Sequence, residues 1–268
     1  MKLRILIRGS NDIGSAVAHM LFQAGYAVVI HDKPRPTVTR RKMAFTNAIF
    51  EGNTRLEDVR AFLVNRNFLL HGMMVHHQVI PLSVGKFDEI LKSVRPQILI
   101  DARMSKHKIP AKQLGVAPLT IGLGPNFVAG SITDLAVETS WGDNLGLVLH
   151  HGATLALKGE PKEIAGHARD RYVYASCSGV FYTSFQPGDP VQEGQKIARI
   201  NKTSLFAPIT GILRGITYDD IPVRTRTKVI EVDPRGAGSQ ISGIAKRPKK
   251  IAEGILHAIR IWEKHRAS

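Results

Sequence analysis

The sequence has very little cysteine: Cys177 is the only one among 268 residues. A single cysteine excludes an internal disulfide framework and fits a reducing compartment, so we expect a cytoplasmic protein. Long hydrophobic runs are also lacking, since no apolar stretch approaches the roughly 18 residues of a membrane-spanning helix. The first residues enter a strand pattern directly, without a charged leader or a small-residue cleavage site. We therefore expect no membrane insertion and no secretion.

Acidic residues are scarce beside basic ones, with 22 Asp and Glu against 37 Lys and Arg, which gives a net charge of +15. Such a charge favours anionic partners, for example nucleotides, phosphorylated cofactors or acidic proteins. The basic residues are mostly dispersed, with short clusters at Arg40–Lys42 and Lys246–Lys250. No nucleic-acid-binding motif surrounds these clusters, so the sequence disfavours a nucleic-acid partner.

Metal-ligand spacing is absent from the histidine-rich segments. His71, His76 and His77 are close in sequence, and His150 and His151 form a second group. Neither group has a recognisable spacing to cysteines or carboxylates. We expect surface or hydrogen-bonded histidines, and no metal site.

The stretch from Met1 to Asp32 contains the strongest fold signal. An apolar strand over Leu3–Ile7 leads into the turn Gly9–Gly14, and a helix follows through Ser15–Ala24. A second apolar strand, Ala27–Ile30, ends just before Asp32. Strand, glycine-containing turn, helix, strand and terminal acid are typical of the opening unit of a doubly wound nucleotide-binding sheet.

The same segment predicts a phosphate site. Gly9 allows a sharp turn, Gly14 allows the helix to approach the strand, and the N–H groups at the helix start, beside Asp12, can hold a pyrophosphate. Asp32 follows Gly14 at a spacing where a carboxylate commonly receives ribose hydroxyls. Asn11, however, occupies the position of the middle glycine and carries a side chain there. A domain that kept this fold and lost or changed its ligand is the open alternative.

Further elements continue the α/β pattern. A helix is predicted over Arg40–Phe50 and another over Phe87–Val94, while Val59–Val64 could be helix or strand. The basic loop Lys33–Pro36, beside the ribose site, leaves the choice between NAD and NADP open. Strands are predicted over Val79–Val84, Ile98–Ile100 and Pro118–Leu123.

Ligands of open α/β sheets collect at the carboxyl ends of the strands. Arg103 and Lys106, which follow the strand ending at Asp101, suit an anionic ligand, but a structural ion pair between Asp101 and Arg103 is an equal alternative. Gly122 and Gly124 either admit a ligand close to the backbone or form a tight turn. The candidate ligand-binding residues are Gly9, Asn11, Asp12, Gly14, Asp32, Asp101, Arg103, Lys106, Gly122, Gly124 and Asn126.

From about Trp141 the sequence becomes rich in β-branched residues and contains an internal repeat with a constant offset. Ala175–Val180 aligns with Ala207–Ile212, and Pro190-Val191 aligns with Pro222-Val223. Two such halves are typical of a barrel-sandwich hybrid, similar to biotinyl and lipoyl carrier domains. Lys202 lies on the predicted hairpin between the halves, but its neighbours lack the carrier motifs, so we interpret this module as structural or partner-binding.

A last helix is predicted over Lys249–Lys264, with one apolar stripe that must be buried against the N-terminal sheet or in a subunit interface, which would make a homo-oligomer. The predicted organisation is an N-terminal Rossmann-like doubly wound sheet at 1–141, an all-β barrel-sandwich hybrid at 142–240, and the C-terminal helix at 241–268. A lone cysteine such as Cys177, in a β-rich repeat, indicates packing more than reactivity. The apolar stripe of the predicted C-terminal helix consists of Ile251, Ile255, Ala258, Ile259 and Trp262.

Taken together, the sequence resembles the accessory proteins of the selenium-dependent molybdenum hydroxylase system over nearly its whole length. The most specific segments are Asp101–Met104 and Gly122–Pro125, and Asn126 stands where the family favours glycine. The other matching residues are Arg8-Gly9, Asp12-Ile13, Arg40-Arg41, Ala44-Phe45, Glu51-Gly52, Lys106, Ile121, Phe127, Ala129-Gly130, Val137–Thr139, Leu145-Gly146 and Asp233–Gly236.

The resemblance implies a Rossmann domain joined to a barrel-sandwich module, and a role in the maturation of molybdenum hydroxylases with labile selenium. The partner would be the hydroxylase or its cofactor-insertion machinery, and the ligand NAD(P) or a molybdopterin-type dinucleotide. An NAD(P)-dependent oxidoreductase is the first alternative, although no Tyr-x-x-x-Lys dyad follows the sheet. A non-catalytic scaffold that docks an acidic partner is the second.

Overall fold

A computed structural model describes residues 2–105, 108–157 and 161–267. The chain divides into two compact units, each with its own contacts. Unit 1 combines Met1–Pro34, Ala44–Lys158 and Ile244–Ser268, and unit 2 combines Arg35–Met43 with Gly159–Gly243. The β-rich module therefore begins later than the predicted residue 142. The chain also enters unit 2 once near residue 35 and returns to unit 1.

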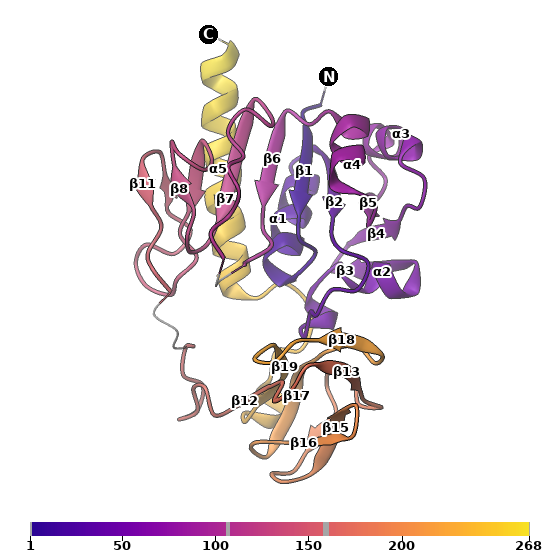
Figure 1. Cartoon of the computed structure of the whole chain (residues 1–268). Helices are drawn as coiled ribbons and strands as arrows, with labels where there is room; N and C mark the ends of the chain where they lie inside the picture. Colours follow the sequence, from indigo (N-terminus) through magenta and orange to yellow (C-terminus); the bar gives the residue numbers. More distant parts are fainter. Residues whose placement is uncertain (1, 106–107, 158–160, 268) are drawn as a thin grey trace. The chain divides into compact units, whose positions relative to one another are not determined.

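Unit 1 is built on a nine-stranded, mostly parallel sheet in the order β10-β9-β7-β6-β1-β2-β5-β4-β3 (Figure 1). Among its described strands, only the outermost pairs, β10 with β9 and β3 with β4, are antiparallel. A separate two-stranded sheet pairs β8 with β11. The strands are β1 (Arg4–Arg8), β2 (Ala27–His31), β3 (Asn53–Leu56), β4 (Val59–Leu63), β5 (Ile80–Ser83), β6 (Ile98–Asp101), β7 (Leu119–Leu123), β8 (Val128–Ala129), β9 (Leu135–Val137), β10 (Val148–Leu149) and β11 (Gly152–Ala153).

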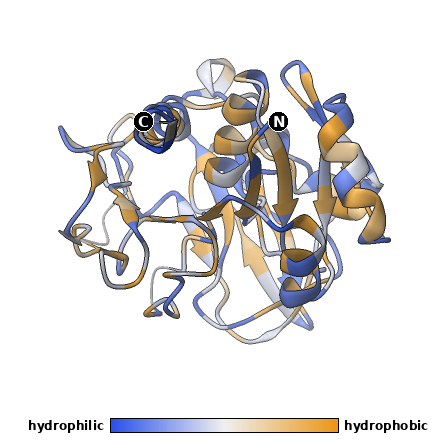
Figure 2. Ribbon diagram, turned by 90° about the horizontal axis from the view of Figure 1, so that it is seen from above, coloured by the Kyte–Doolittle hydropathy of each residue, from blue (hydrophilic) through white to orange (hydrophobic). Residues whose placement is uncertain are grey.

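Both faces of this sheet are buried, as its continuous apolar strands require. Ile5 and Ile7 face a core that includes α1 (Asp12–Gln23) and α5 (Lys246–Ala267). Leu6 faces the opposite core, with α3 (Phe68–His76) and α4 (Phe87–Val94). Figure 2 shows mainly hydrophobic colours along the central strands. The sheet thus lies between two helical layers, and among the described helices none is long and apolar enough to cross a bilayer.

Most predicted elements of unit 1 form within one or two residues of their expected bounds, and Val59–Leu63 proves to be a strand. The predicted helix over Arg40–Phe50 is wrong. A 3₁₀ turn, η1 (Arg41–Met43), is followed by a separate short helix, α2 (Asn47–Glu51). The reason is tertiary: the Ile216 N–H donates to the Thr39 carbonyl at 2.9 Å, which attaches this segment to unit 2. The helix α3 was not predicted.

The C-terminal helix α5 packs along α1 within unit 1, through the stripe that the sequence predicts. Ile251, Ile255 and Ile259 are fully buried. Gly254 is required at its position, because a Cβ there would lie 2.1 Å from the carbonyl oxygen of Gly146. The helix therefore approaches the loop before β10 more closely than any side chain permits.

Unit 2 consists of two four-stranded sheets, ordered β12-β19-β17-β14 and β16-β15-β13-β18. The constant offset seen in the sequence carries β13 onto β17, β14 onto β18 and β15 onto β19, so the internal repeat is confirmed. Each half contributes strands to both sheets. The strands are β12 (Tyr172–Tyr174), β13 (Gly179–Tyr182), β14 (Pro190–Val191), β15 (Lys196–Ile200), β16 (Thr203–Phe206), β17 (Gly211–Ile216), β18 (Ile221–Val223) and β19 (Lys228–Asp233), followed by η2 (Gly236–Gly238).

A buried carboxylate organises the charges of unit 2. Glu231 has no exposed surface, and its carboxylate oxygens lie 2.9–3.5 Å from nitrogens of Arg40, Arg171, Arg214 and Lys228. Burial would raise the pKa of Glu231, but these cations hold it well below its ordinary value. Through Arg40, the same network holds the segment 35–43 in unit 2.

Replacing Gly254 by Ala should destabilise unit 1. Alanine gains roughly 1 kcal/mol of helix propensity over glycine, but its Cβ would overlap the carbonyl oxygen of Gly146. We expect a net loss of about 1–3 kcal/mol from this overpacking, measured by urea unfolding. The neighbouring Glu253→Ala, on the exposed side of the same helix, should change the unfolding free energy by less than about 0.5 kcal/mol. Equal effects of the two variants would contradict the close contact.

Candidate functional site

Polar residues form one row along the carboxyl edge of the parallel sheet in unit 1. Strand register sets Arg8 opposite both His31 and Asp101. On the next strands outward, register sets Gly122 opposite Asp101 and Ser83 opposite His31. The predicted residues Gly9 and Asp32 directly follow the β1 and β2 members of this row. The carboxyl ends that the sequence analysis singled out thus lie together.

The start of α1 is capped by its own sequence. The Oδ1 atom of Asn11 accepts hydrogen bonds from the N–H groups of Ile13 at 3.0 Å and Gly14 at 3.1 Å. Its Nδ2 donates to the carbonyl oxygen of Ala102 at 2.7 Å. Asp12 is the first residue of the helix. Two of the N–H groups that were expected to hold a phosphate are therefore bonded to Asn11.

Gly9 and Gly14 allow close packing at this turn. A Cβ on Gly14 would lie 2.1 Å from the Gly9 carbonyl oxygen, and a Cβ on Gly9 would lie 2.8 Å from that of Ala102. Gly9 also has a φ of +109°, which side chains rarely adopt. The two glycines hold together the loops after β1 and β6, as the fingerprint predicts for helix and strand packing.

The Asp32 carboxylate is engaged by the loop after β1. Its Oδ2 accepts hydrogen bonds from the N–H and the hydroxyl of Ser10, both at 2.7 Å. Its Oδ1 accepts the Lys33 N–H at 2.8 Å. A ribose that used this carboxylate would share it with Ser10.

Asp101 and Arg103 form the ion pair that the sequence analysis left as an alternative. The Arg103 guanidinium binds both carboxylate oxygens, with Nε to Oδ1 at 2.9 Å and Nη2 to Oδ2 at 2.6 Å. Gln113 donates to Oδ2 at 2.7 Å, and Arg8 lies 3.9 Å from it. Burial would raise the pKa of Asp101, but Arg103, Arg8 and Gln113 together hold it below its ordinary value.

Arg8 and His31 were not among the predicted site residues, although each is the last residue of its strand. The Arg8 guanidinium lies 3.8 Å from the ring centre of Phe87, and its Nε is buried without a hydrogen-bond partner in the described part of the chain. Burial, reinforced by Arg103, lowers the pKa of Arg8. Burial also lowers the pKa of His31, so this ring is neutral near pH 7 and adds no charge to the edge.

The end of β7 and the segment that follows it are packed against their own neighbours. A Cβ on Gly122 would lie 2.0 Å from the ring of Phe127, and one on Gly124 would meet Met104 at 3.1 Å. Asn126 has a left-handed backbone, with φ +73°, and its Nδ2 donates to the Lys108 carbonyl. Packing against Phe127 accounts for Gly122, which lies inside β7, and a turn with positive φ accounts for Gly124 and Asn126. Lys106 lies outside the described residues.

The other residues weighed in the sequence belong to other elements than this edge. Cys177 and Lys202 are in unit 2, where the Cys177 Sγ is 3.8 Å from the Thr203 hydroxyl oxygen and Lys202 is exposed on the turn between β15 and β16. His71 and His76 are exposed on α3.

Most of the predicted donors at this edge already have partners within the chain. Arg8 retains an unpartnered buried Nε in the described chain, and Arg103 has 39% of its side chain exposed. Guanidinium groups suit phosphate and carboxylate ligands. The geometry therefore favours Arg8 and the exposed side of Arg103 as the contacts for an anion.

The chain is similar in sequence to a protein of Escherichia coli. The "Uncharacterized protein YqeB" of Escherichia coli strain K12 is 33% identical over 256 residues, which cover 95% of this chain and 47% of that protein. The chain thus spans about half the length of this curated relative. No protein-family model matches the chain.

Among solved structures, an aspartoacylase family protein from Mesorhizobium loti covers 87% of this chain and 85% of its own, with 8% identity and a TM-score of 0.28. The apo structure of the ectoine utilization protein EutE from Ruegeria pomeroyi covers 87% and 86%, with 11% identity and a TM-score of 0.26. TM-scores this low carry no structural or functional argument.

Asp101→Asn should destabilise unit 1 in a pH-dependent way. Breaking a buried ion pair costs about 3–5 kcal/mol, and the partial exposure of Arg103 reduces this to about 2–3 kcal/mol. Because the folded pKa of Asp101 is depressed, its contribution is complete above about pH 4 and is lost as the pH falls through the folded value. Urea unfolding at several pH values measures the difference. The exposed Asp143→Asn is the control, and a loss that did not shrink in acid would contradict the assignment.

Proposed function

We propose that unit 1 is a Rossmann-like nucleotide-binding domain and that unit 2 is a barrel-sandwich hybrid. For unit 1 the support is the strand order: β2 and β5 lie on one side of β1, while β6, β7 and β9 lie on the other. This order reverses beside β1, where doubly wound folds bind their ligands. For unit 2 the support is the internal repeat, because each strand and its equivalent in the other half lie in different sheets: β13 and β17, β14 and β18, β15 and β19.

Following the sequence resemblance, the proposed role of the chain is that of a cytoplasmic accessory protein for maturation of a molybdenum hydroxylase. It binds a nucleotide or a nucleotide-containing cofactor at the carboxyl edge of unit 1. The net charge of +15 and the guanidinium groups of Arg8 and Arg103 favour an anionic ligand. The assignment to molybdenum enzymes rests on the sequence resemblance alone, since the name of the curated relative assigns no activity.

The observation that carries this proposal is the Asn11 side chain at the reversal point of the sheet. Its carboxamide oxygen takes the N–H groups of Ile13 and Gly14, where a phosphate oxygen would bind. Its amide nitrogen joins the loop after β1 to Ala102 after β6. The side chain thus substitutes for a phosphate in the free protein, and a ligand binds by displacing it.

The same observation favours a non-catalytic scaffold as the second candidate. If Asn11 and Ser10 satisfy the helix N–H groups and Asp32 permanently, the sheet needs no nucleotide to be stable. In that case the positive surface would dock an acidic partner. An NAD(P)-dependent oxidoreductase is favoured less, because its cofactor would also need a proton donor at the nicotinamide.

The experiment that tests the proposal is a calorimetric binding screen of the whole chain with NAD, NADP, ATP and a molybdopterin dinucleotide. Asn11→Gly should bind the ligand about fivefold more tightly than the wild type, because the cap that a ligand must displace is worth about 1 kcal/mol. Asn11→Ala separates loss of the cap from relief of steric hindrance, since alanine also removes the cap but keeps a Cβ at the phosphate position. Gly14→Asp should abolish binding through its charge and bulk, and its fold is verified by circular dichroism because a Cβ there would overlap the Gly9 carbonyl oxygen.

Two outcomes contradict nucleotide binding. The first is the absence of binding by both the wild type and Asn11→Gly, with folding verified by circular dichroism. The second is equal affinity in the wild type, Asn11→Gly and Gly14→Asp, which would locate the ligand elsewhere. Retained binding of a partner protein by Gly14→Asp would support the scaffold.

A further inference from the structure

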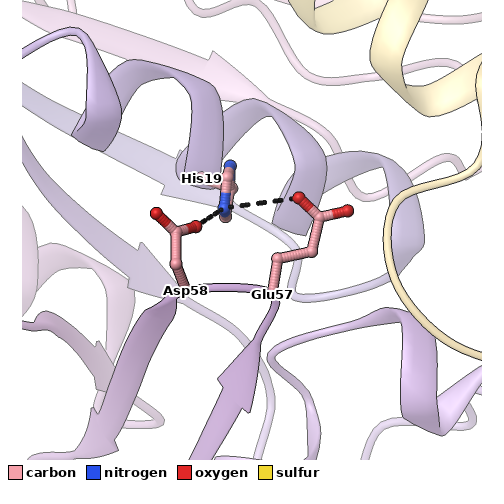
Figure 3. Close-up of side chains that lie close together, drawn as sticks. All are labelled: His19, Glu57 and Asp58. Carbon is pink, nitrogen blue, oxygen red and sulfur yellow. Dashed lines mark hydrogen bonds and ion pairs between the residues drawn. The ribbon is translucent and has the colours of Figure 1, made fainter.

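A histidine and two carboxylates converge in unit 1 away from the carboxyl-edge residues described above. His19 lies on α1, and Glu57 and Asp58 form the turn between β3 and β4 (Figure 3). The His19 Nε2 is 2.8 Å from Asp58 Oδ1 and 3.8 Å from Glu57 Oε2. One ligand atom from each residue lies within 4.8 Å of the other two. We propose that His19, Glu57 and Asp58 bind a divalent transition metal of the zinc type.

Both carboxylates are oriented by groups outside this triad. The second oxygen of Asp58, Oδ2, accepts a hydrogen bond from the side-chain amide of Gln23. The second oxygen of Glu57, Oε1, accepts the backbone N–H of Ile244 at 3.0 Å. Each carboxylate therefore directs its remaining oxygen toward the same imidazole nitrogen. Hydrogen bonds of this kind orient ligands in metal sites and raise metal affinity.

The donor set selects the class of metal. One imidazole nitrogen and two carboxylate oxygens suit Zn²⁺ and related first-row ions, whereas Mg²⁺ and Ca²⁺ prefer oxygen ligands alone. His19 has 11% of its side chain exposed, against 46% for Glu57 and 62% for Asp58. Three protein ligands with one solvent-facing side leave a position for water, as in zinc sites that are open to substrates.

The alternative is a simple hydrogen bond between His19 and Asp58 that orders the turn. This bond explains the 2.8 Å contact, but it needs neither Glu57 at 3.8 Å from the same nitrogen nor an anchor on each carboxylate. Sequence spacing alone predicts no metal site, because these ligands are not close together in the chain. His19 and Glu57 are distant in the sequence and meet only through the packing of α1 against the β3–β4 turn.

The test is isothermal titration of the whole metal-free chain with Zn²⁺ at pH 7, followed by Co²⁺ titration monitored by visible absorption. We expect one Zn²⁺ per chain with micromolar or tighter affinity, an increase in Tm, and Co²⁺ absorption bands of a low-coordinate site. Glu57→Gln and Asp58→Asn should each weaken Zn²⁺ binding at least tenfold. Both residues are exposed, so these variants should fold. Mg²⁺ and Ca²⁺ should produce no heat and no shift in Tm.

Controls separate this site from the exposed histidines. The double variant His71→Gln/His76→Gln should bind Zn²⁺ as the wild type does, and so should Asp143→Asn. His19→Gln should lose binding, with circular dichroism to verify its fold because His19 is largely buried. The proposal is overturned if the wild type binds no Zn²⁺, if Glu57→Gln and Asp58→Asn bind as tightly as the wild type, or if only the His71/His76 variant loses binding.

Discussion

A buried carboxylate at the end of β6 is the constraint on which the candidate site depends. Asp101 is 2% exposed, so its charge must be compensated inside unit 1. Arg103 supplies a two-point ion pair from the following loop, Gln113 adds a hydrogen bond, and Arg8 brings a second guanidinium from β1. These contacts fix the loop after β6. The Ala102 carbonyl in that loop is in turn the acceptor that positions Asn11.

An ion pair with the same two-point geometry occurs in unit 2. Arg235 binds Asp233 with Nε to Oδ1 at 2.9 Å and Nη2 to Oδ2 at 2.7 Å, close to the geometry of Arg103 on Asp101. Both pairs have the form Asp-x-Arg and begin at the last residue of a strand. These segments carry part of the resemblance to the molybdenum accessory proteins, and their shared geometry shows a structural role. They are therefore stronger evidence for the fold than for a ligand.

The sequence predicted what local patterns determine. Continuous apolar strands, the Gly9–Gly14 turn, the apolar stripe of α5 and the internal repeat of unit 2 all depend on neighbours in the chain or on simple periodicity. The attachment of Arg35–Met43 to unit 2 depends on Glu231, far along the sequence, and overrode a plausible helical pattern. Arg8 and His31 were missed because a charged or titratable residue at a strand end has no distinctive pattern until strand register aligns it with its neighbours.

The free energy needed to break each residue's present contacts decides which residues of the carboxyl edge can turn to a ligand. Displacing the Asn11 cap costs about 1 kcal/mol, a fivefold change in affinity, so Asn11 alone cannot exclude a phosphate. Removing Arg103 from Asp101 would break a pair that is buried on the Asp101 side and cost about 2–3 kcal/mol, which a single new anion contact does not recover. Arg8 is different: it lies 3.9 Å from the carboxylate and its Nε has no partner in the described chain. An anion at this edge would therefore recruit Arg8 first, while Arg103 stays with Asp101.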